Sequence, residues 1–475
     1  MLEIALPHVV STQNKAFMNN DTTIQTVLFK ELSAKPVIAS FDQPDSSSDG
    51  GALLLKACDK QLGLSEALAK CLVDSRQTGK IAHSLHDLLR QRIYSLACGY
   101  EDCNDAARLS ADPMQRLLLD RDPVQGADVA SQPTLSRFEN SISSRELLRM
   151  SYALCDCVLE RHRRRLKKRV KLITLDMDPT DDACHGQQQL SFFNRHYDNW
   201  CYLPMGCFVQ FDNEPDQYLL AHVLRGGDAH ATTGATSILG RLIVRIREHF
   251  PGVKIRVRLD GGFGSVDVLD FLDVQGVEYV VGLPPNAVLK DFAEPLQNKV
   301  RWLSYRSGTT QRRFGECRYS ARSWETERRV IYKCEVLRVG EHDARDNPRF
   351  VVTNVRHTPA SVYEKIYCQR ANVENRLKEM QYGLSIDRTS CTRFFANQLR
   401  VILTAAAYAL MQELRLQAKG TSCEGAQVDT LRLRLLKLGV WFKRSVRRLI
   451  LHLPENAPWR SDWCRIARRL GAVPT

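Results

Sequence analysis

The hydrophobic positions change their period along the chain, and the change separates two kinds of structure. Between residues 52 and 159 apolar residues recur three and four positions apart, as at Leu85, Leu88 and Leu89, which predicts amphipathic helices. Gly99 and a series of X-Pro pairs break this part into short pieces. We therefore expect several short helices before the first strand.

Strand-like patterns begin after Lys171. The apolar run 172–175 is followed by acids and a proline, and residues 253–259 alternate with period two before Asp260. This repetition of strand, acid, turn and helix predicts an α/β domain. Further strands are expected at Cys207 to Phe211, Tyr218 to Leu224 and Glu278 to Leu283, and helices at Thr236 to His249 and Ser265 to Leu272.

The remaining segments complete a division of the chain into regions. Residues 300–355 read as strands, and a helical period returns from Pro359 to Met380. The polar start ends in a run of Pro, Asp, Ser and Gly that is typical of a flexible segment. The predicted regions are a flexible lead-in at 1–50, a helical region at 51–165, an α/β core at 170–300 and 356–415, a strand-rich insertion at 300–355 and a basic C-terminal region at 416–475.

The charge balance of the chain narrows the choice of partner. Among 475 residues there are 67 Lys and Arg against 54 Asp and Glu, a formal net charge of +13. This surplus favours nucleic acid or another polyanion, and a basic surface kept for solubility is the plain alternative. Basic faces on the short helices suit contact with DNA phosphates, although an ordinary helical bundle has the same periodicity. The basic positions there are Arg90, Arg92, Arg137, Arg145 and Arg149.

The fifteen cysteines are scattered and include no Cys-x-x-Cys pair. This spacing argues against a structural zinc site and for reduced thiols. The start of the chain lacks the segments of a secretory signal, and the longest apolar run, Val401 to Met411, is too short to cross a bilayer. We therefore expect a soluble, cytoplasmic protein.

Two aspartates stand at the ends of predicted strands. Asp178 follows the strand that begins at Leu172, and Asp260 closes the strand 253–259; ligands of α/β sheets lie at such ends. A two-metal phosphoryl-transfer site needs a third acid, and Mg²⁺ prefers oxygen ligands. The candidate for that third acid is Glu374.

Glu374 lies in a segment with helical period. On a helix, Tyr367, Arg370, Glu374 and Lys378 share one face, so an acid is flanked by two cations. This arrangement can hold a metal ion and a DNA phosphate together. An exposed helix with ordinary ion pairs would show the same spacing.

These motifs together resemble the DDE transposases of bacterial insertion sequences. The likeness rests on Asp178-Pro179-Thr180 at a strand end, on Asp260 at a second strand end, and on Tyr-x2-Arg-x3-Glu ending at Glu374. It is closest to the insertion-sequence family numbered 1380 and extends over roughly residues 50–455. Other segments similar to that family are Gln91-Arg92-Ile93, Gly99-Tyr100-Glu101-Asp102, Leu135-Ser136-Arg137-Phe138-Glu139-Asn140, His185-Gly186-Gln187 and Tyr367 to Glu379.

The resemblance implies an RNase H-like catalytic core with a strand-rich insertion, preceded by a helical DNA-binding domain. It makes Asp178, Asp260 and Glu374 the catalytic acids and the ligands of Mg²⁺, with Mn²⁺ as a substitute. The implied enzyme binds the terminal inverted repeats of its element, cleaves the ends by metal-dependent hydrolysis and transfers the 3′-hydroxyl ends to target DNA. Because two ends must meet, a homodimer is expected, associated with the bacterial nucleoid.

The resemblance also implies which residues contact DNA. Tyr367 and Arg370 match the first two members of the signature, and Arg137 is the contact expected from the helical region. The lysine of the signature is missing, because Gln381 occupies its position. Lys378, one helical turn earlier, is the nearest substitute.

Three assignments stay open at this level. Asp176 could replace Asp178 as the first ligand, although Asp-x-Thr favours Asp178. Trp302 and Trp324 could stack on an unpaired base, and ordinary core tryptophans are the plainer interpretation. His185 is more often a structural hydrogen-bonder than a ligand.

Two other functions compete with a transposase. Asp176-Met177-Asp178-Pro179-Thr180 fits the nucleophile motif of haloacid-dehalogenase-like phosphatases, in which the first aspartate is phosphorylated. A long basic helical region before the motif weakens that reading. The second competitor is a catalytically inactive DNA-binding relative, against which the presence of all three acids argues.

Overall fold

The computed structural model describes residues 26–29, 32–338 and 343–474, which fall into two units divided after Asp45. In the first unit β1 (Thr26–Phe29) pairs antiparallel with β2 (Val37–Ser40). Residues 1–25 of the predicted lead-in lie outside the described residues. The second unit, Ser46–Thr475, contains everything discussed below.

The helical period of the N-terminal half is confirmed, because residues 50–165 form helices joined by short loops. Ser143 begins the longest of them with a capping box to Glu146, which satisfies amides that the first helical turn leaves unpaired. The helices are η1 (Gly50–Ala52), α1 (Leu53–Leu62), α2 (Leu64–Ala69), η2 (Thr78–Lys80), α3 (Leu85–Ala97), η3 (Cys103–Asp105), α4 (Ala106–Leu109), α5 (Pro113–Leu118), α6 (Gln132–Ser141) and α7 (Ser144–Arg165).

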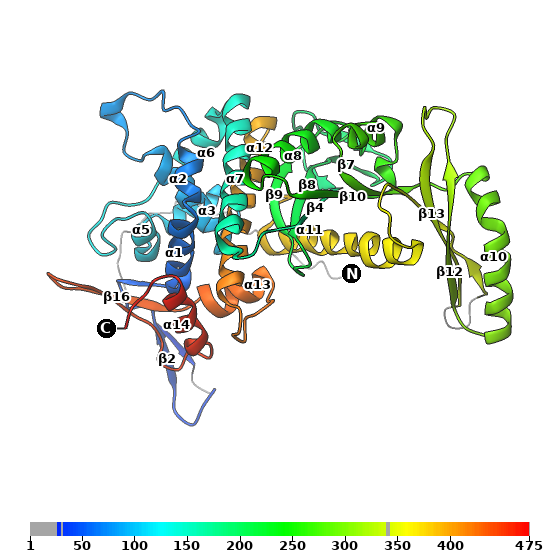
Figure 1. Cartoon of the computed structure of the whole chain (residues 1–475). Helices are drawn as coiled ribbons and strands as arrows, with labels where there is room; N and C mark the ends of the chain where they lie inside the picture. Colours follow the sequence, from blue (N-terminus) through cyan, green and yellow to red (C-terminus); the bar gives the residue numbers. More distant parts are fainter. Residues whose placement is uncertain (1–25, 30–31, 339–342, 475) are drawn as a thin grey trace, which may run out of the picture. The chain divides into compact units, whose positions relative to one another are not determined.

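The long helix α12 (Phe394–Gln417) packs against several of these helices (Figure 1). It contacts α1, α3, α6 and α7, and on another side it contacts the sheet strand β9 (Tyr218–Val223). By length and composition α12 could cross a membrane, but 83% of its most apolar window is buried inside the protein, as in a core helix. The helical region and the sheet therefore share one apolar core around α12.

The central sheet has its parallel strands in the middle. β4 (Leu172–Pro179), β10 (Lys254–Leu259) and β11 (Glu278–Leu283) are parallel neighbours, with β10 in the middle. β8 (Met205–Phe211) and β9 follow β4 on one side, both antiparallel. The buried, apolar interiors of these strands explain the continuous apolar runs in the sequence.

Residues 311–353 continue the same sheet. β15 pairs with β11, and β13 pairs with β15 and β12. The strands expected of a strand-rich insertion are thus present, but they extend the central sheet. The segment before them is α10, which runs across the predicted boundary at residue 300. The elements are α10 (Ala287–Ser307), β12 (Gln311–Tyr319), β13 (Arg328–Leu337), β14 (Arg345–Asp346) and β15 (Arg349–Thr353).

Helices cover both faces of the central strands. Figure 1 shows α8 (Ala235–His249) and α9 (Val266–Val274) on one side of the strands and α11 (Ala371–Leu384) on the other. The segment before α11 is irregular, with a π-helical turn η5 (Ser361–Ile366) and a 3₁₀ turn η6 (Tyr367–Arg370). The expected helix from Pro359 to Met380 is therefore helical but changes its winding at the signature residues.

The end of the predicted lead-in is built into the second unit. β3 (Ser46–Ser47) pairs with β16 (Val440–Arg444), and Asp49 is buried with its carboxylate 2.7 Å from the Lys437 ammonium. Residues 46–50 thus belong to the packed structure. The C-terminal elements are α13 (Val428–Leu431), η7 (Arg432–Leu436), β16, β17 (Leu449–His452) and α14 (Arg460–Arg469).

All fifteen cysteines lie within the described ranges, and none of them is joined to another by a disulfide in this structure.

Candidate functional site

Asp178 and Asp260 are delivered to the same edge of the sheet by neighbouring parallel strands. β4 and β10 pair with Asp176 opposite Arg258, and Asp178 and Asp260 come two residues later on each strand. Asp260 begins the short turn η4 (Gly261–Phe263), where its Oδ1 accepts a 2.9 Å hydrogen bond from the Gly262 amide. The strand ends predicted from the sequence therefore meet in space.

Glu374 reaches this edge from α11, which contacts β4. Arg370 connects the helix to the strand: its Nη1 lies 2.9 Å from Oδ2 of Asp178, and its Nη2 lies 3.6 Å from Oε1 of Glu374. The Glu374 side chain is half exposed, whereas Asp178 is 8% exposed. The structure thus gathers one acid from each of three elements, with an arginine between two of them.

The electrostatics of Asp178 show that the three acids act on one another. Burial raises the pKa of Asp178 to about 7, Arg370 opposes this rise, and the negative charges of Asp260 and Glu374 add to it. Strong perturbation of this kind by burial and specific charges is common at functional sites. An added cation beside Asp178 would therefore favour its ionised form.

The donor set suits a hard divalent ion, but it is not assembled as a finished metal site. Carboxylate oxygens on rigid elements are the ligands that Mg²⁺ takes, and the charge excess at Asp178 favours a cation. In the described part of the chain, however, no three His, Cys, Asp or Glu side chains are grouped closely enough to hold a metal ion. One of the two Asp178 oxygens, Oδ2, accepts a 2.9 Å hydrogen bond from Arg370.

Asp176 has a different environment from Asp178. It is fully buried, and Arg258 contacts both of its oxygens at 2.8 and 2.6 Å. Gln217 donates a further hydrogen bond of 2.7 Å to Oδ2. A carboxylate so enclosed is not accessible as a nucleophile, so the geometry disfavours the phosphatase interpretation and supports Asp178 as the candidate ligand.

Arg258 is the important residue that the sequence reading missed. Besides Asp176, it donates to the carbonyl of Ile366 at 3.1 Å, to Gln369 at 3.2 Å and to Gln210 at 3.0 Å. It thereby fastens the irregular turns before α11 to the sheet. The available signal was an arginine inside a strand whose other core positions are apolar, because such a charge requires a buried acid.

Tyr367 lies against the end of β11. A Cβ atom at Gly282 would come within 2.7 Å of the Tyr367 hydroxyl and within 2.6 Å of the Gly261 amide, so this strand position must stay without a side chain. Burial raises the pKa of Tyr367, Arg370 lowers it and Asp260 raises it. Tyr367 therefore sits beside the acids, as the helical spacing predicted.

Lys378 and Gln381 take separate positions. Gln381 donates to the Thr180 hydroxyl at 3.0 Å and to the Asp181 carbonyl at 3.3 Å, which ties α11 to the loop after β4. Lys378 is exposed and lines a cavity of about 240 Å³ between α11 and α13. Among the described residues no ion pair joins Lys378 to the three acids. The structure does not place it as their cationic partner.

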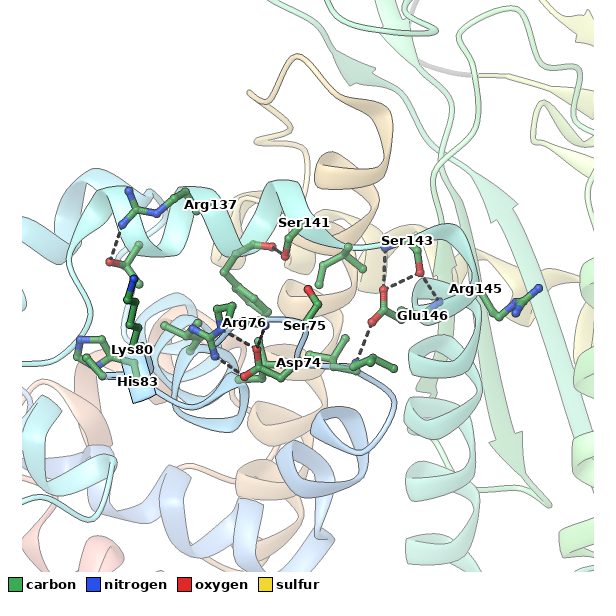
Figure 2. Close-up of a pocket in the computed structure, with 18 of the residues that line it drawn as sticks. Asp74, Ser75, Arg76, Lys80, His83, Arg137, Ser141, Ser143, Arg145 and Glu146 are labelled. Carbon is green, nitrogen blue, oxygen red and sulfur yellow. Dashed lines mark hydrogen bonds and ion pairs between the residues drawn. The ribbon is translucent and has the colours of Figure 1, made fainter. Parts of the chain in front are cut away.

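Arg137 lies in another part of the molecule, on the wall of a cavity. This cavity of about 820 Å³ is bounded by α6, the start of α7 and the loop 72–83 (Figure 2). The two acids that line the cavity have partners within the protein: Asp74 pairs with Arg76 at 2.6 Å, and Glu146 caps α7. Within the described ranges, four cations on its wall form no close ion pair: Lys80, Arg137, Arg145 and Arg149. Arg149 nevertheless lies near enough to Glu146 to lower the pKa of that carboxyl.

Other expected DNA contacts prove to be structural. Arg92 is buried against Glu139 with an N–O distance of 2.9 Å, and Arg90 pairs with Asp87 at 2.8 Å and with Asp120. The basic face predicted at Arg90 and Arg92 is therefore wrong. Sequence periodicity cannot separate an exposed arginine from one that neutralises a buried acid on another helix.

The two tryptophans considered for base stacking differ in exposure. Trp324 is buried, lies edge-on to Tyr319 and is covered by the guanidinium of Arg328, so it is a core residue. Trp302 is half exposed on α10 and contacts Arg306. His185 is exposed in the loop after β5 (Asp182–Ala183).

The chain matches the family model described as transposase DDE domain group 1 over residues 29–475. This match covers nearly the whole chain, so the protein belongs to this family of DDE transposases. Transposases act on DNA, which agrees with the basic charge balance. No curated protein matches the chain.

Proposed function

We propose that the protein is the transposase of a bacterial insertion sequence of the family numbered 1380. In this function it binds the terminal inverted repeats, cleaves the ends by metal-dependent hydrolysis of phosphodiester bonds and transfers the 3′-hydroxyl ends to target DNA. The observation that carries the proposal is the meeting of Asp178, Asp260 and Glu374 at one sheet edge. Membership of the transposase family agrees with it.

The topology supports an RNase H-like core. The strand order β9-β8-β4-β10-β11 places three consecutive antiparallel strands beside two parallel ones. In sequence β4 and β10 are the first and fourth of these five strands; Asp178 lies on β4, and Asp260 directly follows β10. We assign the catalytic core to residues 170–300 and 356–415, with 300–355 as an extension of its sheet. Residues 51–165 form the DNA-binding region in this proposal, and 416–475 complete the basic C-terminal part.

Asp178, Asp260 and Glu374 would hold Mg²⁺, or Mn²⁺ in its place. When bound, such an ion supplies charge stabilisation to the phosphate and acidifies the attacking water. Arg370 pairs with Asp178 at 2.9 Å, and with an ion held by the three acids its guanidinium would be free to contact a DNA phosphate. Tyr367, fixed against Gly282, defines the wall beside Asp260.

The cavity around Arg137 is the second part of the proposed function. Four cations without a close ion pair and the hydroxyls of Thr134, Ser141 and Ser143 line it, and these groups suit the phosphate backbone of double-stranded DNA. Figure 2 shows that Arg137 and Arg145 come from two different helices on this wall. Lys378, exposed on α11, is an additional backbone contact. Binding of two ends requires a homodimer, acting on DNA in the bacterial cytoplasm.

The test is cleavage of linear DNA that carries the ends of the element encoding this chain, with Mg²⁺ and the full-length protein. Asp178→Asn, Asp260→Asn and Glu374→Gln should each lower the cleavage rate by about a thousandfold, since several kcal/mol of transition-state stabilisation are lost. Glu455→Gln, an exposed acid far along the chain, is the matched control and should cleave normally.

Retained DNA binding in the three acid variants would show that they fold and bind. Normal cleavage by Asp260→Asn or Glu374→Gln would refute the assignment of the site. Direct titration with Mn²⁺ gives an independent measure, because each substitution should weaken ion binding even without DNA.

A further inference from the structure

A small three-stranded sheet lies between β4 and β8 in the sequence and begins just after Asp178. β5 (Asp182–Ala183), β7 (Asn199–Tyr202) and β6 (Phe192–Asn194) pair antiparallel in that order. The chain enters this sheet directly after β4 and returns from it into β8, the antiparallel neighbour of β4. The Thr180 amide donates to the Pro204 carbonyl at 3.0 Å and closes the base. The sheet is therefore anchored beside Asp178.

The outer face of the hairpin formed by β6 and β7 is aromatic where a solvent-facing strand pair normally carries polar side chains. Phe193 and Trp200 stand directly opposite each other, 49% and 55% exposed. Their rings meet edge to face with centroids 6.4 Å apart. Cys201, the next residue along β7, is buried on the inner face. The two exposed rings thus share one outward surface that the fold itself does not need.

The tip of the hairpin is held in place and carries an exposed cation, Arg195. Asn194 accepts from the His196 amide at 2.9 Å and donates to the Gly227 carbonyl at 2.9 Å, which fixes the turn to the body of the protein. Arg195 and His196 are exposed and have no acidic partner in the described part of the chain; Asp198 is the acid of the same turn. Cations beside exposed aromatic rings are the chemistry of surfaces that bind single-stranded nucleic acid.

The hairpin also reaches back to the acids. Tyr197, half-buried at the tip, has its pKa raised by burial and by the negative charges of Asp181, Asp178 and Asp260. The hairpin is also tied to this region by the chain itself, because the sheet that contains it follows β4 and leads into β8. A protein partner of this face would need an interface of about 1,000 Å² or more, whereas one nucleobase needs only an aromatic ring.

We propose that Phe193 and Trp200 stack on an unpaired nucleobase of the DNA strand held at the three acids, with Arg195 and His196 on its phosphates. This inference rests on the proposed function and adds a base-binding surface to it. Stacking needs no particular base, because every base has a π-face. The surface therefore favours unpaired DNA over duplex without reading sequence.

The experiment measures binding of the full-length protein, without divalent ions, to three fluorescent DNA probes. One is a plain duplex, one carries a short single-stranded flap of thymidines, and one carries the same flap with abasic sites. The wild type should bind the thymidine flap about tenfold more tightly than the abasic flap. Trp200→Ala and Phe193→Ala should remove most of this preference, and Trp200→Phe should keep most of it. All variants should bind the plain duplex like the wild type.

Trp441→Ala, which removes another half-exposed tryptophan, is the matched control and should keep the preference. Loss of the preference in Trp302→Ala, with Trp200→Ala unchanged, would overturn the proposal and move stacking to α10. A wild type that binds duplex but does not distinguish the flaps would overturn this inference alone. A wild type that binds none of the probes would overturn the proposed function as well. A change in oligomeric mass in Trp200→Ala, with the flap preference intact, would identify a protein interface and also overturn it.

Discussion

Two aspartates on β4, two residues apart, have opposite electrostatic environments. Asp176 lies inside the sheet, and Arg258 and Gln217 satisfy its carboxylate completely. Asp178 lies at the strand end, pairs with Arg370 and is close enough to two more acids for their charges to raise its pKa. Within the sheet an unpaired charge would be too costly, whereas at the edge an excess of negative charge can be kept for a ligand.

The helical region shows the same contrast with positive charge. Arg92 is buried and paired with Glu139, so it serves the fold. Arg137, Arg145 and Arg149 line an open cavity and form no close ion pair among the described residues. In both regions, charges that are fully paired hold elements together, and charges that are left unbalanced mark candidate binding surfaces.

The largest expected effect comes from breaking the buried pair. Arg258→Met should lower the free energy of unfolding by about 3–5 kcal/mol, because Asp176 would remain buried without its partner. Arg370→Met should cost far less, since Asp178 is near the edge and can take up a proton. Urea denaturation of both variants measures the difference.

The double variant Asp176→Leu with Arg258→Met is the control for this comparison. Replacing both charges by apolar groups should restore part of the lost stability, although Gln217 loses a partner. Equal losses of unfolding free energy in Arg258→Met and Arg370→Met would contradict the distinction between Asp176, buried inside the sheet, and Asp178 at the strand end.

The second effect is a pH dependence that belongs to Asp178. Its pKa is about 7 in the folded state against 3.8 for the unperturbed group, so the folded protein keeps a proton that the unfolded chain releases. This contribution to stability is complete below about pH 4 and is lost as the pH rises through 7, at a cost of about 2–4 kcal/mol. Thermal unfolding without divalent ions should show Tm falling over this range, and less steeply in Asp178→Asn.

Burial also raises the pKa of Asp182, to about 8, so Asp182 likewise makes the protein less stable as the pH rises. Asp178→Asn should therefore remove only part of the fall of Tm with pH. Addition of Mn²⁺ at pH 8 should raise the Tm of the wild type and not that of Asp178→Asn. Identical pH curves for the two proteins would show that Asp178 does not carry the excess charge.

The smallest effect concerns the unpaired cations of the cavity. Arg145→Ala and Arg149→Ala should each weaken binding to any duplex and reduce the slope of log affinity against log salt by about one. Arg163→Ala is the control, because Arg163 is exposed but paired with Glu160 at 2.7 Å. Fluorescence anisotropy measures duplex binding at several salt concentrations. The same slope in all three variants would contradict a role of the cavity arginines in binding DNA phosphates.

Much of the fold could be predicted from local pattern. Residues 278–283 were expected as a strand and form β11 with the same limits, and the helix expected at Thr236 begins one residue earlier as α8. Such segments are periodic and bounded by turns. The merging of residues 311–353 into the central sheet was not predictable, because strand pairing joins residues far apart in sequence.

The candidate site shows the same limit. Strand ends and helical spacing indicated that Asp178, Asp260 and Glu374 could meet. In the structure the charges of Asp260 and Glu374 raise the pKa of Asp178, but among the described residues the three acids do not form a group that could hold a metal ion, so their joint role stays a prediction. The spacing also placed Lys378 on their side, yet it lines another cavity. Glu374 and Lys378 both lie on the regular helix α11, but helical spacing cannot tell which neighbouring element stands beside each turn, and beside Lys378 that element is α13.

The sequence by itself determined the alternation of helices and strands, the acids at two strand ends and the excess of positive charge. It did so because periodicity and composition are properties of neighbouring residues. Only the tertiary structure decided which charged side chains form ion pairs inside the fold, as Asp176 and Arg258 do. It also decided which remain available to bind a ligand, as Asp178 and Arg137 do. Burial and pairing depend on what the rest of the chain places beside a side chain, and that information is not local.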